Sequence, residues 1–486
     1  MILWLTAAFL ILSLVASGLV GCSTVVHENN GGINANRGND YKLPYVAEAE
    51  EGRLSSGVNV YDMESGFSGK GYVGQFKEEG DYVEVDVLVP EEGNYELIIR
   101  YLIPKGYGDK INSIYINGKY YGAITFTEEH GFAEKKVGIA QLNEGKNVIK
   151  FQKNPGDWGW MFVDNFTVNK ITTKSAWKFD VSAQLINPNA DEKTKKLFEY
   201  LCSIYGKKIL TGQQLYFSNE EEINKIFSIT GKLPAIKGYD MINQTPGGHI
   251  DDQVERAIDW HIKHKGIVTM CWHWWAPKDG RAFYTKDTKF DITKAVTPRT
   301  KEYKLIIRDM DIVAGKLKEM QEAGVPVLWR PLHEASGGWF WWGAKGPEAY
   351  KKLWRLMYDR FTNYHKLNNL IWVWNGQHPE WYVGDEYCDI VGEDIYPGKR
   401  VYSSHPGKFG ENYDIVRGRK PIALTETGCL PDPEHIKTTG AWWLWFMIWW
   451  GDFITTDEYN DYEMLKKVYN HEDVITLDEL PTGLFK

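Results

Sequence analysis

Two glutamates lie at the ends of predicted strands, where a carboxyl group can be held ready for acid–base or nucleophilic chemistry. Glu334 ends the segment VPVLWRPLHE (325–334), and Glu426 lies within KPIALTETG (420–428). Glycoside hydrolysis needs two carboxyl groups across a cleft, because one protonates the leaving oxygen while the other attacks the anomeric carbon or activates water. One glutamate at a strand end is more often a helix cap or an ion-pair partner. The hypothesis that these residues are catalytic therefore depends on both glutamates being present.

Tryptophans follow the first of these glutamates at close spacing. The stretch WRPLHEASGGWFWWG (329–343) runs through two glycines to three tryptophans. Glycine allows a sharp turn, so we expect Trp339 to fold back over the cleft, with Trp341 and Trp342 packed beneath it. Sugars present flat apolar CH faces rimmed by hydroxyls, and aromatic rings match that shape. The chain has 21 Trp, most of them after residue 270, which favours a tryptophan-lined cleft even though several will be core.

Strand-like and helix-like segments alternate through the second part of the chain, and this alternation indicates an α/β fold. Eight strand segments with helical periodicity between them, over roughly 280 residues, predict a (β/α)8 TIM barrel. A doubly wound open sheet is the alternative, but it would more often begin with a Gly-rich phosphate loop, and no G-x-G-x-x-G motif occurs. The eight segments are 207–214, 233–240, 266–275, 325–334, 368–377, 387–396, 420–428 and 441–451.

The carboxyl ends of the barrel strands are the positions where reactive side chains are expected. The two glutamates follow the fourth and seventh strands, which lie on roughly opposite sides of the barrel mouth, so their carboxyl groups can face each other. The other residues at these ends are Gln213, Asp240, His273, His333, Gln377, Asp394, Tyr396 and Trp449.

The first part of the chain has a different pattern. A length of 486 residues exceeds the size at which single cores stop growing, so two domains are expected. Regular spacing of six or more short strands at 46–170, separated by turn signals such as PEEGN, predicts an antiparallel β-sandwich. A linker at 171–188 and the barrel domain at 189–486 follow. The strand segments are YVEVDVLV, YELIIRYLI, SIYING, YGAITF, NVIKFQ and MFVDNFTV.

The first 22 residues form an apolar run that ends at Gly21-Cys22. This resembles a bacterial lipoprotein signal peptide, in which the Cys is lipidated and becomes the mature first residue, although no Lys or Arg precedes the run. Residues 23–45 are polar and Asn/Gly-rich, which predicts a flexible tether. We expect an exported protein on the bacterial cell surface or outer membrane, touching the membrane only through the lipid anchor, or otherwise a secreted protein.

The overall charge and the cysteines exclude several other classes of protein. The net charge of −9 and the lack of a Lys/Arg-rich run argue against nucleic acid as a partner. We expect a monomer. The four remaining cysteines are far apart without a C-x-x-C pair, so they are predicted to be structural thiols rather than a metal site or disulfide framework. They are Cys202, Cys271, Cys388 and Cys429.

The second domain resembles a known family through WRPLHEASGGWFWWG, ALTETG, VGEDIYPG and WHWWAP. From about residue 180 to 480 it is similar to glycoside hydrolase family 26, which is dominated by β-mannanases. The resemblance implies a (β/α)8 barrel that hydrolyses mannan, glucomannan or galactomannan with retention and without a cofactor for catalysis. It implies that Glu334 is the acid/base and Glu426 the nucleophile.

The same resemblance implies roles for other residues. His333 corresponds to a histidine that contacts the reacting sugar, and Tyr396 to a tyrosine that hydrogen-bonds the nucleophile. Trp339 corresponds to a sugar-stacking tryptophan, His273 to a further subsite histidine, and Trp449 to a sugar platform. These roles agree with the chemistry, because an acid needs a pKa raised by apolar walls or negative charge, whereas a nucleophile must stay ionised.

The first domain resembles a family 35 carbohydrate-binding module through VAEAEEGRL, YVGQF, GNYELIIRY, YINGK, LNEGKNVIKF and MFVDNFTV, in that order. The resemblance implies a structural calcium ion held by Glu48, Glu50 and Asp164, and carboxylate oxygens suit calcium. The alternative is that these are exposed acids at strand ends. The module's sugar site would lie in KNPGDWGW, with Asn154, Trp158 and Trp160 as its residues, and one of the two tryptophans is expected to be core.

Several alternatives remain open from the sequence. A mixed-linkage β-glucanase or a β-1,3-xylanase could use the same fold, because mannose and glucose differ in the orientation of the 2-hydroxyl and the sequence does not place His273 or His333 finely enough. A non-catalytic glycan-binding lipoprotein is a different class, which the presence of both glutamates argues against. Endo or exo action depends on loops over the cleft, which are read least reliably.

Overall fold

A computed structural model describes residues 42–155, 157–170, 177–216, 219–249, 251–278 and 281–485. The predicted signal peptide, its Cys22, nearly all of the tether and the first residues of the linker lie outside these ranges. None of the helices within them is both long enough and apolar enough to cross a membrane.

The first domain is an antiparallel β-sandwich, as predicted. One sheet has the strand order β3-β4-β11-β6-β9 with β1 beside β11, and the other has the order β2-β5-β10-β7-β8. Buried and half-buried residues alternate along β5 and β10, so every second side chain enters the core between the sheets. The strands are β1 Tyr45–Glu48, β2 Arg53–Leu54, β3 Asn59–Tyr61, β4 Tyr72–Gly74, β5 Tyr82–Val89, β6 Gly93–Leu102, β7 Lys110–Ile116, β8 Lys119–Phe126, β9 Ala133–Leu142, β10 Gly145–Gln152 and β11 Phe162–Lys170, with the 3-10 turn η1 at Ala49–Glu51.

The second domain is a closed barrel of eight parallel strands, which confirms the predicted fold class. Each strand from β12 to β19 pairs with the next, and β12 also pairs with β19 and closes the ring. All eight lie inside the segments predicted from the sequence. The strands are β12 Ile209–Gln214, β13 Ile236–Asp240, β14 Ile267–Trp272, β15 Val327–Pro331, β16 Leu370–Trp374, β17 Ile390–Ile395, β18 Ile422–Thr427 and β19 Trp445–Ile448, with β20 Val474–Ile475 beside β12.

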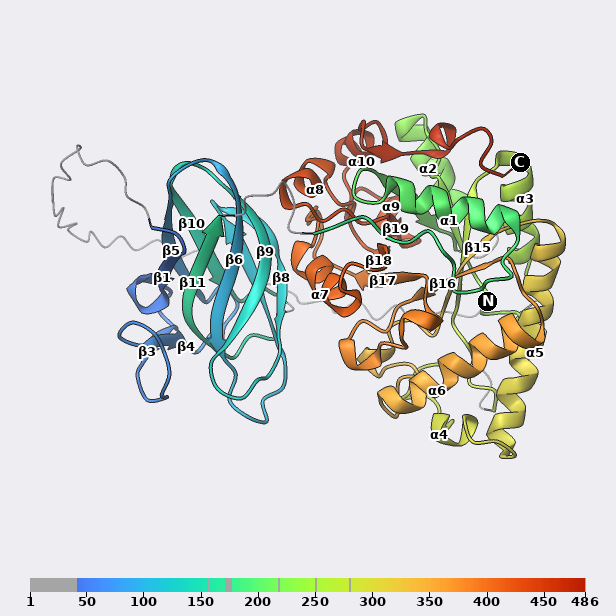
Figure 1. The fold of residues 1–486 in the computed structure, drawn as a ribbon, viewed down its shortest axis with the longest axis horizontal. Helices are drawn as coiled ribbons and strands as arrows, with labels where there is room; N and C mark the ends of the chain where they lie inside the picture. Colours follow the sequence, from blue (N-terminus) through green and yellow to red (C-terminus); the bar gives the residue numbers. More distant parts are fainter. Residues whose placement is uncertain are drawn as a thin grey trace, which may run out of the picture. The chain divides into compact units, whose positions relative to one another are not determined.

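Helices surround the barrel strands in Figure 1. The long helix α5 shows why they form: its side chains at three- and four-residue spacing are buried, and the Thr300 hydroxyl accepts a hydrogen bond from the N–H of Tyr303 as an N-cap. The helices are α1 Glu192–Ile204, α2 Glu221–Thr230, α3 Gln253–His264, α4 Ile292–Ala295, α5 Lys301–Glu322, α6 Pro347–Tyr358, α7 Pro406–Val416, α8 Pro433–Thr439, α9 Asp452–Thr455 and α10 Tyr462–Tyr469. Shorter elements are η2 Ala335–Gly337, η3 Asp359–Tyr364, η4 Pro379–Trp381, η5 Asp385–Tyr387 and η6 Leu477–Glu479.

Most of the tryptophans belong to the core of this domain and not to a cleft. Trp272 and Trp274 stack with ring centroids 4.0 Å apart, and both are fully buried. Large flat rings of this kind fill the layers inside the barrel and between strands and helices. The other fully buried tryptophans are Trp329, Trp341, Trp342, Trp354, Trp372, Trp374, Trp443 and Trp445.

Candidate active site

The two glutamates meet at the carboxyl end of the barrel. Glu334 follows β15 and Glu426 lies near the end of β18. One carboxylate oxygen each from Glu334, Asp394 and Glu426 lie within 4.8 Å of one another. That closeness fits the spacing of about 5–5.5 Å between carboxyl groups in retaining glycosidases, because inverting enzymes leave about 6.5–9.5 Å for a water molecule.

A buried arginine orders these carboxylates. Arg330 lies on β15 with 3% of its surface exposed, and its Nη1 donates to Asp394 Oδ2 at 2.9 Å. Its Nη2 donates to Glu426 Oε1. On the other side, the Tyr396 hydroxyl donates to Glu426 Oε2 at 2.6 Å. Both donors favour the ionised form of Glu426 and fix the orientation of its carboxylate.

Burial raises the pKa of both glutamates. The Asp394 carboxylate adds to the upward shift of Glu334. At Glu426, Arg330 opposes the shift while Asp394 and Glu334 add to it. Interacting sites titrate as a pair, so the hydrogen bonds decide which group holds the proton. Glu426 accepts from a guanidinium and a phenol, whereas the Glu334 carboxylate accepts from one indole N–H. We therefore place the proton on Glu334.

The backbone that carries Glu334 is strained. Leu332 and Glu334 both have φ of 52°, in the left-handed region that costs about 1–3 kcal/mol for a side chain of this size. The N–H of Glu334 is held by two acceptors of Asn375, its carbonyl at 2.8 Å and its side-chain Oδ1 at 3.1 Å. The turn directs Glu334 toward the barrel axis and His333 toward His273.

The stretch after Glu334 turns back as expected from its glycines. A Cβ on Gly337 would lie 1.9 Å from the Trp339 ring, and Gly338 has φ of 69°. Trp339 is 45% exposed, and its Nε1 donates to Glu334 Oε2 at 3.0 Å. Trp341 and Trp342 are fully buried behind it. Trp339 therefore has an exposed ring face beside the Glu334 carboxyl, and only glycine at 337 leaves room for it.

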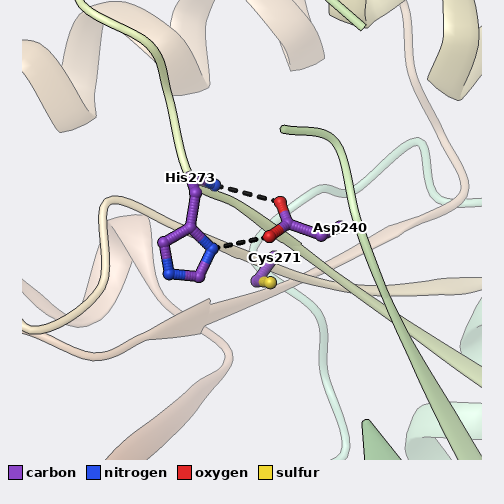
Figure 2. Close-up of side chains that lie close together, drawn as sticks. All are labelled: Asp240, Cys271 and His273. Carbon is purple, nitrogen blue, oxygen red and sulfur yellow. Dashed lines mark hydrogen bonds and ion pairs between the residues drawn. The ribbon is translucent and has the colours of Figure 1, made fainter. Parts of the chain in front are cut away.

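Two histidines and an aspartate form a hydrogen-bonded chain beside the glutamates. Figure 2 shows Asp240, at the end of β13, bonded twice to His273: its Oδ2 faces Nδ1 at 2.6 Å and its Oδ1 accepts from the backbone N–H at 3.0 Å. His273 Nε2 lies 3.1 Å from His333 Nε2. Burial lowers the pKa of His273, but Asp240 and Glu426 outweigh it and the net shift is upward. Burial, with Arg330 and His273, lowers the pKa of His333. Asp240 thus favours a proton on Nδ1 of His273, and one hydrogen bond joins the two Nε2 atoms.

Cys271 lies next to this chain in Figure 2. Ligand atoms of Asp240, Cys271 and His273 converge within 4.8 Å, a grouping that could hold a metal ion. Each is already engaged, because His273 Nδ1 bonds Asp240 and the Cys271 thiol donates to the Tyr239 carbonyl at 3.6 Å. Burial raises the pKa of the Cys271 thiol well above its usual value, so it stays protonated. The hydrogen bonds favour a fixed histidine and a structural thiol.

A cavity of about 210 Å³ is lined by His273 and Asp240. Trp449 and Trp450 line it after β19, together with Tyr216, whose ring centroid lies 4.4 Å from that of Trp450. Gln253 also lines it, with 1% of its surface exposed, and its Nε2 has no hydrogen-bond partner among the described residues. Aromatic rings and an unpaired buried amide suit a sugar, which offers both CH faces and hydroxyl oxygens.

The two glutamines predicted at strand ends support neighbouring residues. Gln213 is fully buried, and its Nε2 donates to the carbonyls of Gln214 at 2.8 Å and Trp449 at 3.3 Å. Gln377 donates from Nε2 to the Asp394 carbonyl at 3.1 Å. Neither side chain reaches the glutamate carboxyl groups through a hydrogen bond in the part of the chain that the structure describes.

Sequence reasoning missed Arg330, Asn375, Gln253 and Trp450. Arg330 could have been noticed, since it is a charged residue inside the apolar strand VLWRP and buried charges require partners. Asn375 directly follows the apolar LIWVW and carried a weaker signal of the same kind. Gln253 and Trp450 carried none, because their place at the cavity depends on how distant loops meet.

The predicted calcium residues lie together in the sandwich. Pairing of β1 with β11 puts Glu48 opposite Asn165, next to Asp164. Ser68 Oγ donates to Glu48 Oε2 at 2.7 Å, while Glu50 Oε2 is buried and has no hydrogen-bond partner in the described part of the chain. Burial raises the pKa of Glu48, and the carboxylates of Glu50 and Asp164 add to the shift. The unpaired oxygen and the crowded negative charge fit an oxygen-coordinated cation, although Arg100 already pairs with Asp164.

The predicted sugar residues of the sandwich separate into two kinds. Trp158 is 71% exposed. Trp160 packs between Tyr107 and Phe162, with ring centroids 4.8 and 5.5 Å away, so it is the packing member of the pair. The Asn154 amide is engaged internally, since Nδ2 donates to the Tyr115 hydroxyl and Oδ1 accepts from Gln152, both at 2.7 Å. Trp158 and the half-exposed Tyr107 therefore present the accessible rings.

Known proteins resemble the chain along nearly its whole length. It is 42% identical to mannan endo-1,4-β-mannosidase A of Piromyces sp over 456 residues, 90% of this chain and 72% of that protein. It is 39% identical to a mannan endo-1,4-β-mannosidase of Thermothelomyces thermophilus, covering 89% and 90%. The crystal structure of the Podospora anserina GH26-CBM35 β-(1,4)-mannanase superposes with a TM-score of 0.63 at 38% identity, covering 91% of this chain and 99% of that one.

Family profiles assign the two domains separately. The profile of carbohydrate binding module (family 35) matches residues 45–171, which hold the β-sandwich. The profile of glycosyl hydrolase family 26 matches residues 186–479, which hold the barrel and both glutamates. With this match and the relatives above, the chain belongs to glycosyl hydrolase family 26 and carries a family 35 carbohydrate-binding module ahead of the barrel.

Proposed function

We propose that the chain is a retaining endo-β-1,4-mannanase acting on mannan, glucomannan or galactomannan. The observation that carries the proposal is the approach of Glu334 and Glu426 within 4.8 Å at the ends of the fourth and seventh barrel strands. Relatives covering most of the chain, which are mannan endo-1,4-β-mannosidases, support β-1,4-mannan over mixed-linkage glucan or β-1,3-xylan. Both carboxyl groups are present, which argues against a protein that only binds glycans.

The reaction then proceeds in two displacements. In the first, a Glu426 carboxylate oxygen bonds to the anomeric carbon while the bond to the leaving oxygen breaks, and Glu334 gives that oxygen its proton. In the second, Glu334 takes a proton from water, the water oxygen bonds to the anomeric carbon, and Glu426 leaves as the carboxylate. Esterified Glu426 has no charge, so the pKa of Glu334 falls between the steps and the same group turns from acid to base.

Roles for the surrounding residues follow from their positions. The Tyr396 hydroxyl and Arg330 hold the nucleophile. His333 and His273 are proposed to bond hydroxyls of the sugar whose anomeric carbon reacts, once the sugar replaces the contact between their two Nε2 atoms. Trp339 stacks on the sugar on the leaving-group side, because its ring lies beside the acid carboxyl. Trp449 and the cavity lined by His273 are proposed to bind the sugar unit on the other side of the reacting sugar from the leaving group.

The sandwich domain is proposed to bind polysaccharide through Trp158, with Tyr107 beside it, and to hold calcium through Glu48, Glu50 and Asp164. Carbohydrate-binding modules raise the effective concentration of substrate at a tethered catalytic domain. We further propose that the chain is exported and lipidated at Cys22. The apolar run and the Gly-Cys junction support this, and they lie outside the described residues.

Substrate choice tests the proposed function directly. The purified protein is expected to shorten mannan, glucomannan and galactomannan to mixed oligosaccharides within the first turnovers, which size-resolved chromatography would detect. Lichenan and β-1,3-xylan are expected to stay long. Faster cleavage of either of those two would replace the mannanase assignment, and release of a single small product from mannan would replace internal cleavage.

Glu426→Ala and Glu334→Ala separate the two carboxyl roles. Glu426→Ala is expected to abolish hydrolysis of every substrate, since no covalent intermediate forms. Glu334→Ala is expected to lose about 10²–10⁴-fold in kcat/KM on mannan but to keep much of the activity on 2,4-dinitrophenyl β-mannobioside, whose leaving group needs no proton. Equal loss on both substrates in the Glu334 variant would contradict the acid assignment.

Trp339 has two functions that different substitutions distinguish. Trp339→Ala should fold normally and lose about tenfold to a few hundredfold in kcat/KM, through lost stacking and burial. In the wild-type protein the hydrogen bond from the Trp339 N–H lowers the pKa of Glu334. Trp339→Phe keeps an aromatic ring but loses this hydrogen bond. The pKa of Glu334 therefore rises, the acid form persists to higher pH, and the basic limb of kcat/KM should move upward.

The fully buried Trp341 provides the contrast. Trp341→Ala is expected to cost about 3–5 kcal/mol of stability, measured by urea unfolding. A Trp339→Ala protein with normal kinetics and a similar loss of stability would make Trp339 a packing residue. A basic limb that stays in place in Trp339→Phe would remove the proposed effect of the indole hydrogen bond.

Calcium is expected to stabilise the sandwich domain and to leave the barrel transition unchanged. A ligand bound only by the folded state stabilises by mass action, so a chelator should lower the melting temperature of that domain in calorimetry. Glu50→Gln should remove the response to calcium. Glu51→Gln is the matched control, because Glu51 is an exposed neighbour paired with Lys70. A chelator without effect on the wild-type protein would exclude this metal set.

A further inference from the structure

Asn375 lies directly after β16 and connects the turn of one glutamate to the carboxylate frame of the other. It is fully buried. Its Oδ1 accepts the backbone N–H of Glu334 at 3.1 Å, and its Nδ2 donates to Asp394 Oδ1 at 2.7 Å and to Thr425 Oγ1 at 2.6 Å. We infer that Asn375 is a positioning residue that holds the acid/base Glu334 in its reactive orientation, an inference that rests on the proposed role of Glu334.

The orientation of the Asn375 amide has one consistent solution. The N–H of Glu334 can only donate, so it requires the amide oxygen. The Asp394 carboxylate accepts from Arg330 and requires the amide NH₂. A flipped amide would set oxygen against carboxylate and NH₂ against N–H, which loses both contacts. No other side chain of this size offers one acceptor and two donors in a planar group, apart from the longer Gln.

The hold on Glu334 matters because its backbone lies in a region that the residue would not adopt by itself. Such conformations persist only where neighbours over-determine them. Asn375 supplies both acceptors for the Glu334 N–H, one from the backbone and one from the side chain. A substitution keeps the first and removes the second, so the turn should loosen without unfolding.

The same amide gives the turn a fixed reference. The Asp394 carboxylate accepts hydrogen bonds from the Asn375 amide and the Arg330 guanidinium, and Arg330 also donates to Glu426. The position of the acid relative to the nucleophile is therefore transmitted through Asn375, Asp394 and Arg330. A displacement of the Glu334 carboxyl group by a fraction of an ångström would affect proton transfer first, because that step needs the carboxyl group within hydrogen-bond reach of the leaving oxygen.

The experiment compares kcat/KM for two β-mannobiosides in each enzyme. The first carries 2,4-dinitrophenol, which leaves without a proton, and the second carries 4-methylphenol, which needs one. We take the ratio of kcat/KM for the dinitrophenyl substrate to kcat/KM for the methylphenyl substrate. This ratio is independent of the fraction of folded protein, because both values come from one preparation. In Asn375→Ala this ratio is expected to rise about tenfold to a hundredfold over wild type, part of the about 10²–10⁴ that a general acid supplies.

Two reference variants make the result decisive. Asn369→Ala removes another fully buried asparagine, at the opposite end of β16, where Nδ2 donates to the Val325 carbonyl at 3.0 Å; it should lower stability and leave the ratio at the wild-type value. Glu334→Ala should give the largest ratio of the series. An unchanged ratio in Glu334→Ala would overturn the acid role itself. With that ratio raised, an unchanged ratio in Asn375→Ala would overturn the positioning role of Asn375.

Discussion

The ion pair between Arg330 and the two carboxylates Asp394 and Glu426 is the interaction on which the active site depends. Three carboxyl groups within a few ångströms cannot all ionise in a buried site without a compensating cation. Arg330 is always charged and offers its donors in a planar fork, so one guanidinium can bind two acids at fixed angles. Because its side chain is 4% exposed, water cannot replace either contact, and removal of Arg330 would leave two buried carboxylates without a counter-ion.

The ion pairs of Arg330 with Asp394 and Glu426 make the surroundings of the two glutamates different. Glu426 receives the guanidinium and the Tyr396 hydroxyl, so it remains the better anion of the pair. Glu334 stands outside the frame, joined to it by backbone contacts with Asn375 and bonded at its carboxyl by an indole N–H. The hydrogen bonds therefore favour a proton on Glu334, the group that is proposed to donate it. Two identical side chains acquire opposite roles from unequal hydrogen bonding, in the way known for paired carboxyls of other hydrolases.

The strained turn at Glu334 is held in place by the tryptophans packed around it. Left-handed Glu334 would be costly in an isolated peptide, and the full burial of Trp341 and Trp342 offsets part of that cost. Trp342 Nε1 donates to the His333 carbonyl at 2.8 Å, which ties the packed layer to the reactive turn. Rigid packing beneath the site is what allows a flexible glutamate to be held to a small range of positions.

The amino-acid sequence by itself determined the alternation of strands and helices, the sandwich ahead of the barrel, and the two glutamates at strand ends. Those features are local, since hydrophobic periodicity and turn residues act over a few positions. It missed β9, whose charged first half AEKK hides the alternation. Tertiary structure alone decided that Arg330 meets partners 64 and 96 residues away. It also decided which tryptophans face the cleft and which amide supports Glu334. Closing the barrel brings such distant strand ends together, and no local pattern encodes which side chains then touch.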